Sequence, residues 1–237
     1  MQRYFKNAEC DVYSLSNDDS HHILRVMRLS IGANVEVVNN EKLYITEIID
    51  TTDNIVTVKN VEEVLTNNEL SVSVTLVQAA VKEQKMDYIL QKSCELGVSE
   101  IIVLNTNRSI VKLDSKETKK IERWNKILKE ASEQSKRNVI PIVKGIMNLS
   151  DIIGLDYDIK ILCTVNEFDN NVKRVLSKVN NGDRIIFIVG PEGGFTEEEE
   201  RKLTIDGYLP ISLGRRVLRT ETASLFMLSL INYEFME

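Results

Sequence analysis

A glycine-rich segment, Val189–Phe195, is the first part of this sequence whose residue types could form a binding site. Its glycines, Gly190, Gly193 and Gly194, let a backbone turn sharply and approach a ligand with no Cβ atoms in the way. No Gly-Lys-Ser/Thr follows, so the segment is not a P-loop, and its glycine spacing differs from the dinucleotide fingerprint. If this segment binds a ligand, its backbone amides are therefore better suited to a base or a carboxylate than to a triphosphate. The alternative is a tight strand-to-helix turn that binds nothing.

A second segment, Leu213–Ala223, combines a glycine with three arginines and also lies between a predicted strand and a predicted helix. This clustering suggests that the segment handles an anion. Arg219 is the sharpest candidate, because it comes just before the helix. Two structural alternatives stay open: Thr220 also suits a helix N-cap, and Glu221 suits a first-turn acid beside the positive end of the helix.

Basic residues in the first and middle parts of the chain form a third group. Each one alone is typical of a solvated surface charge, but as a set they suggest contacts to phosphates. The net charge of −6 speaks against nucleic acid, yet residues 82–144 hold 14 Lys/Arg against 9 Asp/Glu, whereas residues 1–68 hold 6 against 11. We therefore expect a local basic patch on an acidic protein. The candidate phosphate contacts are Arg3, Arg25, Arg28, Lys82, Lys85, Arg108, Lys112 and Arg137.

The elements that must position these residues begin with a small β-rich unit over residues 1–68. Val35–Val38, Leu43–Ile49 and Ile55–Val61 are rich in β-branched residues and predict strands, and a short helix is expected near Asp19–Leu29. The polar stretch Thr66–Glu69 follows the last of these strands. It places a domain boundary after residue 68 and leaves residues 69–237 as a second domain.

From Leu70 onward, predicted strands alternate with predicted helices. Ile159–Thr164 and Arg184–Val189 are apolar runs of the kind found in buried parallel strands. The other expected strands are Val72–Gln78, Glu100–Leu104, Val139–Val143 and Leu209–Leu213, and the expected helices lie near Lys82–Leu96, Glu117–Ser135, Asn170–Val179, Thr196–Thr204 and Thr222–Phe235. This alternation predicts an α/β domain with a mostly parallel sheet. The last helix has a broad apolar face that suits either core packing or a subunit interface.

The composition of the 237 residues excludes several classes of protein. Apolar residues make up 43% and charged residues 28%, which suits a packed globular chain. Aliphatic runs such as Ile185–Val189 are far shorter than the roughly 20 residues that cross a bilayer, and the first residues lack the apolar core of a signal peptide, so a cytoplasmic protein is expected. Cys10, Cys94 and Cys163 suit reduced thiols, not a disulfide framework or a zinc site. Only two histidines are present, which excludes a three-histidine metal site.

Taken together, several blocks resemble the RsmE family of SPOUT-class methyltransferases, which use S-adenosylmethionine to methylate N3 of a uridine in 16S ribosomal RNA. The two signature segments are Gly190-Pro191-Glu192-Gly193-Gly194 and Leu213–Ala223. Further matching blocks, in the same order along the chain, are Arg3–Phe5, His21–Arg28, Lys85–Val98, Arg108–Lys112 and Glu133–Pro141. The resemblance covers nearly the whole chain.

This resemblance implies a PUA-like RNA-binding domain over residues 1–68 and a SPOUT methyltransferase domain with a C-terminal trefoil knot over residues 69–237. It also implies a homodimer, 16S ribosomal RNA of the small subunit as the partner, S-adenosylmethionine as the cofactor, and no metal. Arg219 is then expected to stabilise the uracil anion, and Glu221 to accept its N3 proton. The expected cofactor-binding residues are Cys163, Thr164, Gly190, Glu192, Gly193, Gly194, Ile211, Leu213, Gly214, Val217, Leu218 and Thr220.

Three competing interpretations remain at this point. One is a SPOUT methyltransferase that acts on transfer RNA or on a ribose 2′-hydroxyl. Another is a non-catalytic RNA-binding assembly factor, against which the intact glycine segment and Leu218–Ala223 argue. The third, a nicotinamide-dependent enzyme, is disfavoured by the glycine spacing.

Overall fold

The parallel sheet predicted after Leu70 is present in the computed structural model, which describes residues 1–108 and 117–236. The chain forms two compact units. The first consists of Met1–Asn68 together with Ser132–Val139, and the second of Glu69–Ala131 together with the residues from Ile140 onward. A short segment from the middle of the chain thus belongs to the N-terminal unit.

The first unit is built on a sheet with the strand order β1-β3-β4-β5-β2, in which β1 and β3 are parallel and the other pairs antiparallel. Its strands are β1 (Arg3–Lys6), β2 (Val12–Ser14), β3 (Asn34–Asn39), β4 (Lys42–Asp50) and β5 (Thr57–Val64). The sequence predicted the last three of these. It did not predict β1 and β2, because three or four residues are too few to show an alternating pattern. Tyr4 and Tyr13 anchor these two strands in the core of the unit.

The helix expected near Asp19–Leu29 is shorter and built from two kinds of turn. α1 (Asn17–His21) starts after the N-cap Ser16 and passes directly into η1 (His22–Val26), which is a π-helix. Ile23 in η1 is fully buried, and the imidazole of His22 lies 2.9 Å from the hydroxyl of Tyr4. The helical segment ends at Val26, and a short 3₁₀ turn, η2 (Thr52–Asn54), precedes β5.

The second unit contains a sheet with the strand order β11-β9-β10-β6-β7-β8, in which every pair is parallel. The strands are β6 (Ser73–Ala79), β7 (Glu100–Asn105), β8 (Ile142–Asn148), β9 (Ile159–Cys163), β10 (Arg184–Val189) and β11 (Leu209–Ile211). The helices are α2 (Glu83–Glu95), α3 (Glu117–Gln134), α4 (Leu149–Ile152), α5 (Val172–Leu176), α6 (Glu197–Ile205) and α7 (Thr220–Phe235). Among the residues with a described structure, no helix is both long and apolar enough to cross a membrane.

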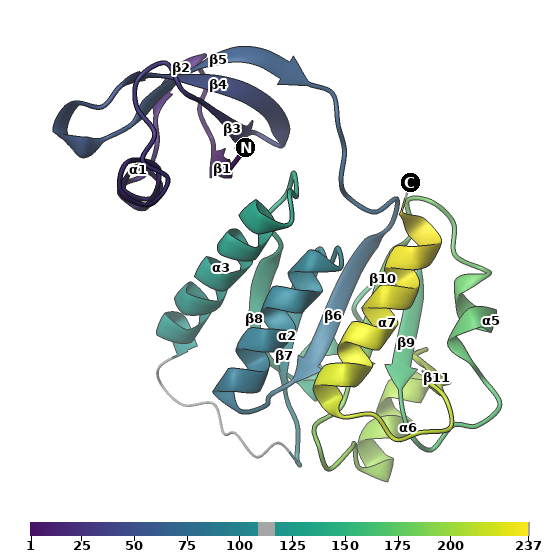
Figure 1. Cartoon of the computed structure of the whole chain (residues 1–237). Coiled ribbons are helices and arrows are strands. Elements are labelled where there is room, and N and C mark those ends of the chain that lie inside the picture. The colour runs from purple at the N-terminus through teal and green to yellow at the C-terminus, as the bar shows by residue number, and fades with distance from the viewer. Residues whose placement is uncertain (109–116, 237) are drawn as a thin grey trace. The chain divides into compact units, whose positions relative to one another are not determined.

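Helices cover both faces of this sheet (Figure 1). Side chains such as Leu76 and Phe187 face α2, α3, α5 and α7, whereas their neighbours Val77 and Ile188 face α4 and α6. Because both faces are buried, the strands read as continuous apolar runs in the sequence. α6 begins with a capping box, in which Thr196 and Glu199 exchange side-chain and backbone hydrogen bonds.

The register of β9 brings three loops together at one edge of the sheet. Cys163, the last residue of β9, lies opposite Val189 of β10 and opposite Ile211 of β11. These strands therefore end at the same level, and the N–H of Thr164 donates to the carbonyl of Ile211 at 3.1 Å. The loops that follow β9, β10 and β11 leave the sheet side by side. The trefoil knot implied by the resemblance stays a prediction.

Candidate functional site

A cavity of about 440 Å³ lies at the carboxyl ends of β9 and β10, next to the start of α7. In parallel α/β sheets, this edge is where ligands bind. A second cavity of about 280 Å³ shares Cys163, Thr164, Val217 and Leu218 with the first and extends along the loop after β11. The larger cavity is lined by Arg108, Cys163, Thr164, Val165, Asn166, Val189, Gly190, Pro191, Glu192, Gly193, Gly194, Phe195, Glu200, Val217, Leu218, Arg219, Thr220 and Ala223.

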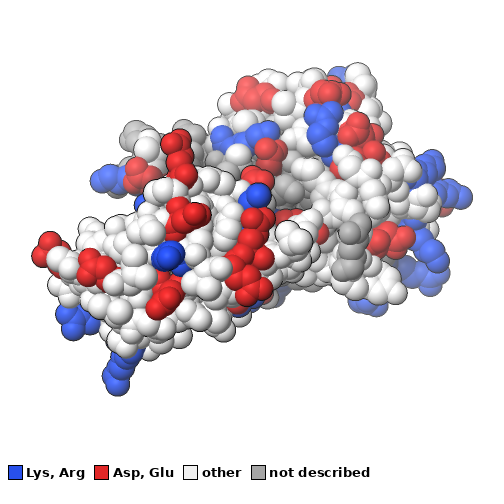
Figure 2. Space-filling model, turned by 90° about the horizontal axis from the view of Figure 1, so that it is seen from above, with Lys and Arg blue, Asp and Glu red and all other residues white. Residues whose placement is uncertain are grey.

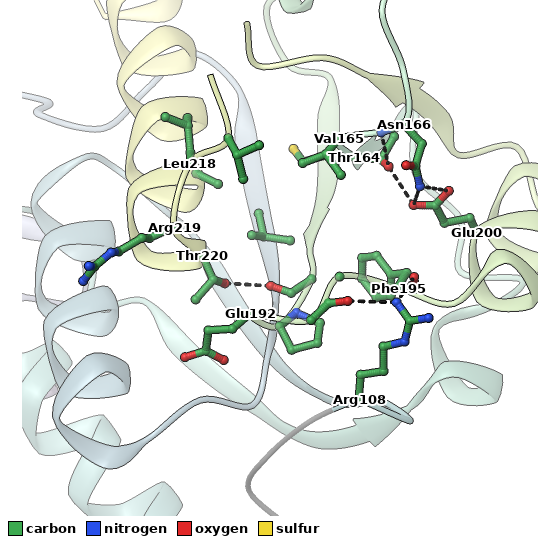
Figure 3. Close-up of a pocket in the computed structure, with 18 residues that line it drawn as sticks. Arg108, Thr164, Val165, Asn166, Glu192, Phe195, Glu200, Leu218, Arg219 and Thr220 are labelled. Carbon is green, nitrogen blue, oxygen red and sulfur yellow. Dashed lines mark hydrogen bonds between the residues drawn. The ribbon is translucent and has the colours of Figure 1, made fainter. Parts of the chain in front are cut away.

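The glycine loop, residues 190–195, forms one wall of the larger cavity (Figure 3). A Cβ atom at Gly190 would lie 3.0 Å from the ring of Phe195, which is itself buried. Gly194 has a φ of +66°, in the left-handed region that favours glycine. Both positions therefore need glycine to fold the loop, and the folded loop presents its backbone to the cavity.

A buried chain of hydrogen bonds ties the glycine loop to α7 and to β6. The hydroxyl of Thr220 donates to the carbonyl of Gly190 at 2.7 Å and accepts from Nε2 of Gln78 at 3.0 Å. Oγ of Ser224 donates to the other end of the Gln78 amide. The N-cap of α7 is Arg219, so Thr220 is the first helical residue and the N-cap interpretation of Thr220 is wrong. Its hydroxyl instead fixes the loop that lines the cavity.

Arg108, predicted as an RNA contact, holds the glycine loop from the other side. Its Nη1 donates to the carbonyls of Gly193 at 2.9 Å and Phe195 at 3.2 Å (Figure 3). Two carbonyls fixed by one guanidinium set the orientation of the intervening peptide planes. The structure therefore gives Arg108 a contact to the loop backbone, and its predicted phosphate contact stays a prediction.

Lys85, also predicted as an RNA contact, joins two carboxylates. Its Nζ donates to Oε1 of Glu192 at 2.9 Å and lies 3.3 Å from the buried Oε2 of Glu221. The second contact is an ion pair without hydrogen-bond geometry, and this Glu221 oxygen has no hydrogen-bond partner among the described residues. Burial raises the pKa of Glu192, but the bond from Lys85, a backbone hydrogen bond and the positive charges of Lys85 and Lys82 together outweigh burial and hold the pKa below its ordinary value. The bond to Glu192 also raises the pKa of Lys85.

The sequence analysis did not single out Glu200, whose carboxylate lines the cavity. Oε1 accepts from Oγ1 of Thr164 at 2.6 Å and from the amide of Asn166 at 3.2 Å (Figure 3). The acidic run Glu197–Glu200, which includes this residue, is typical of a helix start, and Glu199 does fill that role. Because a helix turns by about 100° per residue, the next carboxylate points elsewhere, and no sequence signal marked that direction.

Cys163 lines both cavities but is not suited to act as a nucleophile. Burial raises the pKa of its thiol to about 12, so the thiol stays protonated near neutral pH. In the part of the chain that the structure describes, no group of three or more His, Cys, Asp or Glu side chains is placed to hold a metal ion.

The predicted cofactor residues lie together, with one exception. All of them except Ile211 line one of the two cavities. Ile211 is fully buried in the core, and it contributes only the carbonyl that accepts from Thr164. Arg219 lines the larger cavity at its rim, and its side chain extends away from Thr164 and Glu200 (Figure 3). It has no hydrogen bond or ion pair to any other described residue.

The predicted RNA contact at Arg3 is contradicted by burial. Arg3 is only 3% exposed, and its guanidinium donates to Glu36 at 3.0 Å and to Asn138 at 2.9 Å, as well as to the carbonyls of Lys136 and Arg137. Arg137 is buried to a similar degree. Both side chains are therefore largely shielded from a phosphate, and the bonds of Arg3 connect β1 to β3 and to residues 136–138.

The remaining predicted RNA contacts differ in their surroundings. Arg25, Arg28 and Lys82 are exposed, and Lys112 lies outside the described residues. Figure 2 shows acidic and basic side chains interspersed on the face that it draws, with no broad field of one sign. The face drawn there therefore carries no broad basic surface for a phosphate backbone.

Comparison with known proteins connects both units to RNA modification. Residues 68–232 match a family model described as an RNA methyltransferase domain, and residues 15–59 match one described as an RNA methyltransferase PUA domain. The ribosomal RNA small subunit methyltransferase E of Bacillus subtilis is 34% identical over 249 residues, which cover 99% of this chain and 97% of that protein. The protein of the same name from Buchnera aphidicola (strain APS) is 32% identical and covers 94% of this chain and 88% of its own.

Solved structures give the same result for the fold. The crystal structure of ribosomal RNA small subunit methyltransferase E from Neisseria gonorrhoeae, bound to S-adenosyl methionine, superposes with a TM-score of 0.89 at 28% identity. The alignment covers 99% of this chain and 98% of that one. A putative methyltransferase from Legionella pneumophila with the same bound cofactor has a TM-score of 0.88 at 32% identity, over 98% of this chain and 96% of its own.

Proposed function

Because this chain belongs to the ribosomal RNA small subunit methyltransferase E family, we propose that it methylates N3 of a uridine in 16S ribosomal RNA of the small subunit with S-adenosylmethionine. The observation that carries the proposal is the cavity walled by the glycine loop and the start of α7 at the carboxyl ends of β9 and β10. The cytoplasm, where small subunits assemble, is the expected place of action.

The residues that line the cavity fit S-adenosylmethionine. The cavity volume of about 440 Å³ lies within the range of small-molecule sites, and three of the lining residues, Gly190, Gly193 and Gly194, have no side chain to obstruct a ligand. The carboxylates of Glu192 and Glu200 also line the wall, which favours a cationic, hydroxyl-bearing ligand over a polyphosphate. When bound, S-adenosylmethionine supplies an electrophilic methyl group on a positively charged sulfur.

Arg219 is the residue proposed to stabilise the uracil. N3 of uracil must lose its proton before or during the transfer, and the resulting negative charge spreads onto the ring oxygens. The exposed guanidinium of Arg219 at the cavity rim has no competing partner among the described residues, so it is available to those oxygens. The first N–H groups of α7 begin at the same place and add positive potential.

Glu221 is the proposed proton acceptor. Lys85 fixes it beside Glu192, which lines the cavity, and one buried Glu221 oxygen keeps its hydrogen-bonding capacity unused among the described residues. Because Lys85 links the two carboxylates, Glu221→Gln and Glu192→Gln must be compared side by side. A larger loss of methyl transfer in the second variant would move the proton acceptor from Glu221 to Glu192.

The deciding experiment is the transfer of a labelled methyl group to small ribosomal subunits that lack the modification, followed by identification of the nucleoside. We expect N3-methyluridine in the ribosomal RNA. Label on transfer RNA or on a ribose hydroxyl would favour the rival methyltransferases, and calorimetry that detects no binding of S-adenosylmethionine would favour a non-catalytic assembly factor. Arg219→Ala is expected to lower turnover at least about 100-fold, the scale of one lost anion-stabilising donor.

We also propose a homodimer. α7 leaves Phe226 and Tyr233 exposed, at 40% and 74%, next to the buried face that packs on the sheet. Light scattering coupled to size exclusion measures the mass directly, and a particle of 27 kDa would contradict the dimer.

A further inference from the structure

The first unit contains a hollow of about 380 Å³ that the predicted cofactor site does not involve. One wall comes from α1 and η1, and the other from the turn around η2. The lining residues are Asn17, His21, Leu24, Arg25, Asp53, Asn54 and Ile55. Polar groups and two apolar side chains therefore meet in one place on a domain whose family model names RNA methyltransferases.

The backbone on both sides of the hollow is unusual. η1 is a π-helix, a rare geometry that is frequent at functional sites. On the opposite wall, Asp53 and Asn54 have φ values of 55° and 60°, so two consecutive residues that are not glycine are left-handed. Such conformations persist only where the surroundings enforce them. Here Asp50 fixes the turn, because its Oδ1 accepts from the backbone N–H groups of Thr51 and Thr52 at 2.8 and 3.2 Å.

The chemistry of the lining suits a nucleobase better than a phosphate. Arg25 donates weakly to Oδ1 of Asn54 at 3.3 Å, and the carboxylate of Asp53 has no hydrogen bond or ion pair to any described residue. A carboxylate repels a phosphate but accepts hydrogen bonds from an exocyclic amino group. Leu24 and Ile55 are half-buried and offer apolar contact to a flat ring. Proteins recognise RNA sequence mainly through unpaired bases, whose flat faces and hydrogen-bonding edges are both accessible.

We propose that this hollow binds one unpaired nucleotide of the RNA substrate, with a base that carries an exocyclic amino group. Asp53 accepts from that amino group, and Arg25 contacts the base or its phosphate. Uracil fits poorly, because its single N–H lies between two carbonyl oxygens that the carboxylate repels. The nucleotide is therefore not the methylated uridine but a second anchor that sets which uridine is presented. This inference rests on the proposed function, since it assumes an RNA substrate.

The test measures binding of fluorescently labelled single-stranded RNA hexamers to the full chain at low salt, by anisotropy. We expect the cytidine hexamer to bind at least about fivefold more tightly than the uridine hexamer, as one good base contact predicts. Asp53→Asn keeps a side chain that tolerates the left-handed backbone, and it should reduce this ratio below about twofold. Arg25→Ala should weaken both hexamers.

Two matched control variants change charge on the same unit outside the hollow. Lys59→Ala removes an exposed positive charge and Glu62→Gln an exposed negative one, both on β5. The inference is overturned if wild type does not discriminate between the hexamers, if Asp53→Asn keeps the full preference, or if Glu62→Gln abolishes it equally. Methyl transfer to small subunits is measured separately on wild type. If wild type transfers no methyl group, the proposed function is overturned. The ratio of the two hexamer affinities still tests whether the hollow binds a nucleotide.

Discussion

Replacing Thr220 by valine removes one hydroxyl from the buried connection between the glycine loop and α7. Valine has nearly the same shape, so packing is retained while two hydrogen bonds are lost, one to the Gly190 carbonyl and one from Gln78. A buried group left without its partner costs about 1–3 kcal/mol, so we expect a loss of about 2–4 kcal/mol in the free energy of unfolding. For a chain of this size, that corresponds to a fall in Tm of about 5–12 °C.

The matched control is Thr222→Val, which makes the same chemical change at an exposed position two residues further along α7. Thermal and urea unfolding of both variants measure stability, and calorimetry measures the Kd for S-adenosylmethionine. Because the loop loses one of its attachments, Thr220→Val should also bind S-adenosylmethionine about five- to tenfold more weakly, the equivalent of one hydrogen bond. If the two variants are equally stable and bind equally well, Thr220 does not fix the loop and the reasoning fails.

Three further predictions concern charged side chains whose partners the structure shows. Arg108→Ala should weaken binding of S-adenosylmethionine about tenfold in the absence of RNA, the scale of its hydrogen bonds to the loop; an unchanged Kd would restore its interpretation as an RNA contact. Lys85→Met should lower methyl transfer about tenfold, because it removes a charged hydrogen bond to Glu192. The control variant Lys82→Met should stay near wild type, and equal losses in the two variants would indicate that both lysines bind phosphate. Burial raises the pKa of Glu36, but its bonds from Lys136 and Arg3 outweigh this and hold the folded pKa below the ordinary value of 4.5. As the pH falls, Glu36 is protonated in the unfolded chain before it is protonated in the folded chain. The stability that this carboxylate contributes is therefore fully present above pH 4.5 and is lost as the pH falls through the lower, folded pKa. Glu36→Gln should therefore flatten the acid limb of the stability curve, and an unchanged limb would refute the assignment.

Most of the second unit could be predicted from its sequence, because buried parallel strands and amphipathic helices leave regular patterns. β10 was predicted with its observed bounds, Arg184–Val189, since both of its faces are buried. Short elements gave no such pattern. α4 has four residues and was not predicted. β8 was predicted to end at Val143 but runs to Asn148, because its apolar and polar residues alternate too weakly to mark the end of the strand.

The glycine loop of the candidate site could be predicted from the sequence, but the hydrogen-bond partners of its charged side chains could not. Gly190 and Gly194 are required by sterics that act locally, so the glycine loop could be found from its sequence. The basic residues could not be assigned in the same way. Arg3 and Arg108 are both arginines, and the sequence does not distinguish them. In the structure, Arg3 is buried among acceptors of the first unit, whereas Arg108 donates to carbonyls of the glycine loop in the second unit. Only the tertiary structure decides which acceptor each cation meets.

The assignment of Ser132–Val139 to the N-terminal unit has a consequence for synthesis of the protein in the cell. A chain that is still being translated can pair β1 with β3 early, but Arg3 must wait for Asn138, 135 residues later, before its guanidinium is satisfied. The first unit thus stays incomplete while much of the second is being made, in contrast to the usual order in which N-terminal domains finish first. A fragment that ended just after residue 68 would keep the ion pair between Arg3 and Glu36 but would lack the three acceptors that residues 136–138 offer to the buried Nη1 of Arg3.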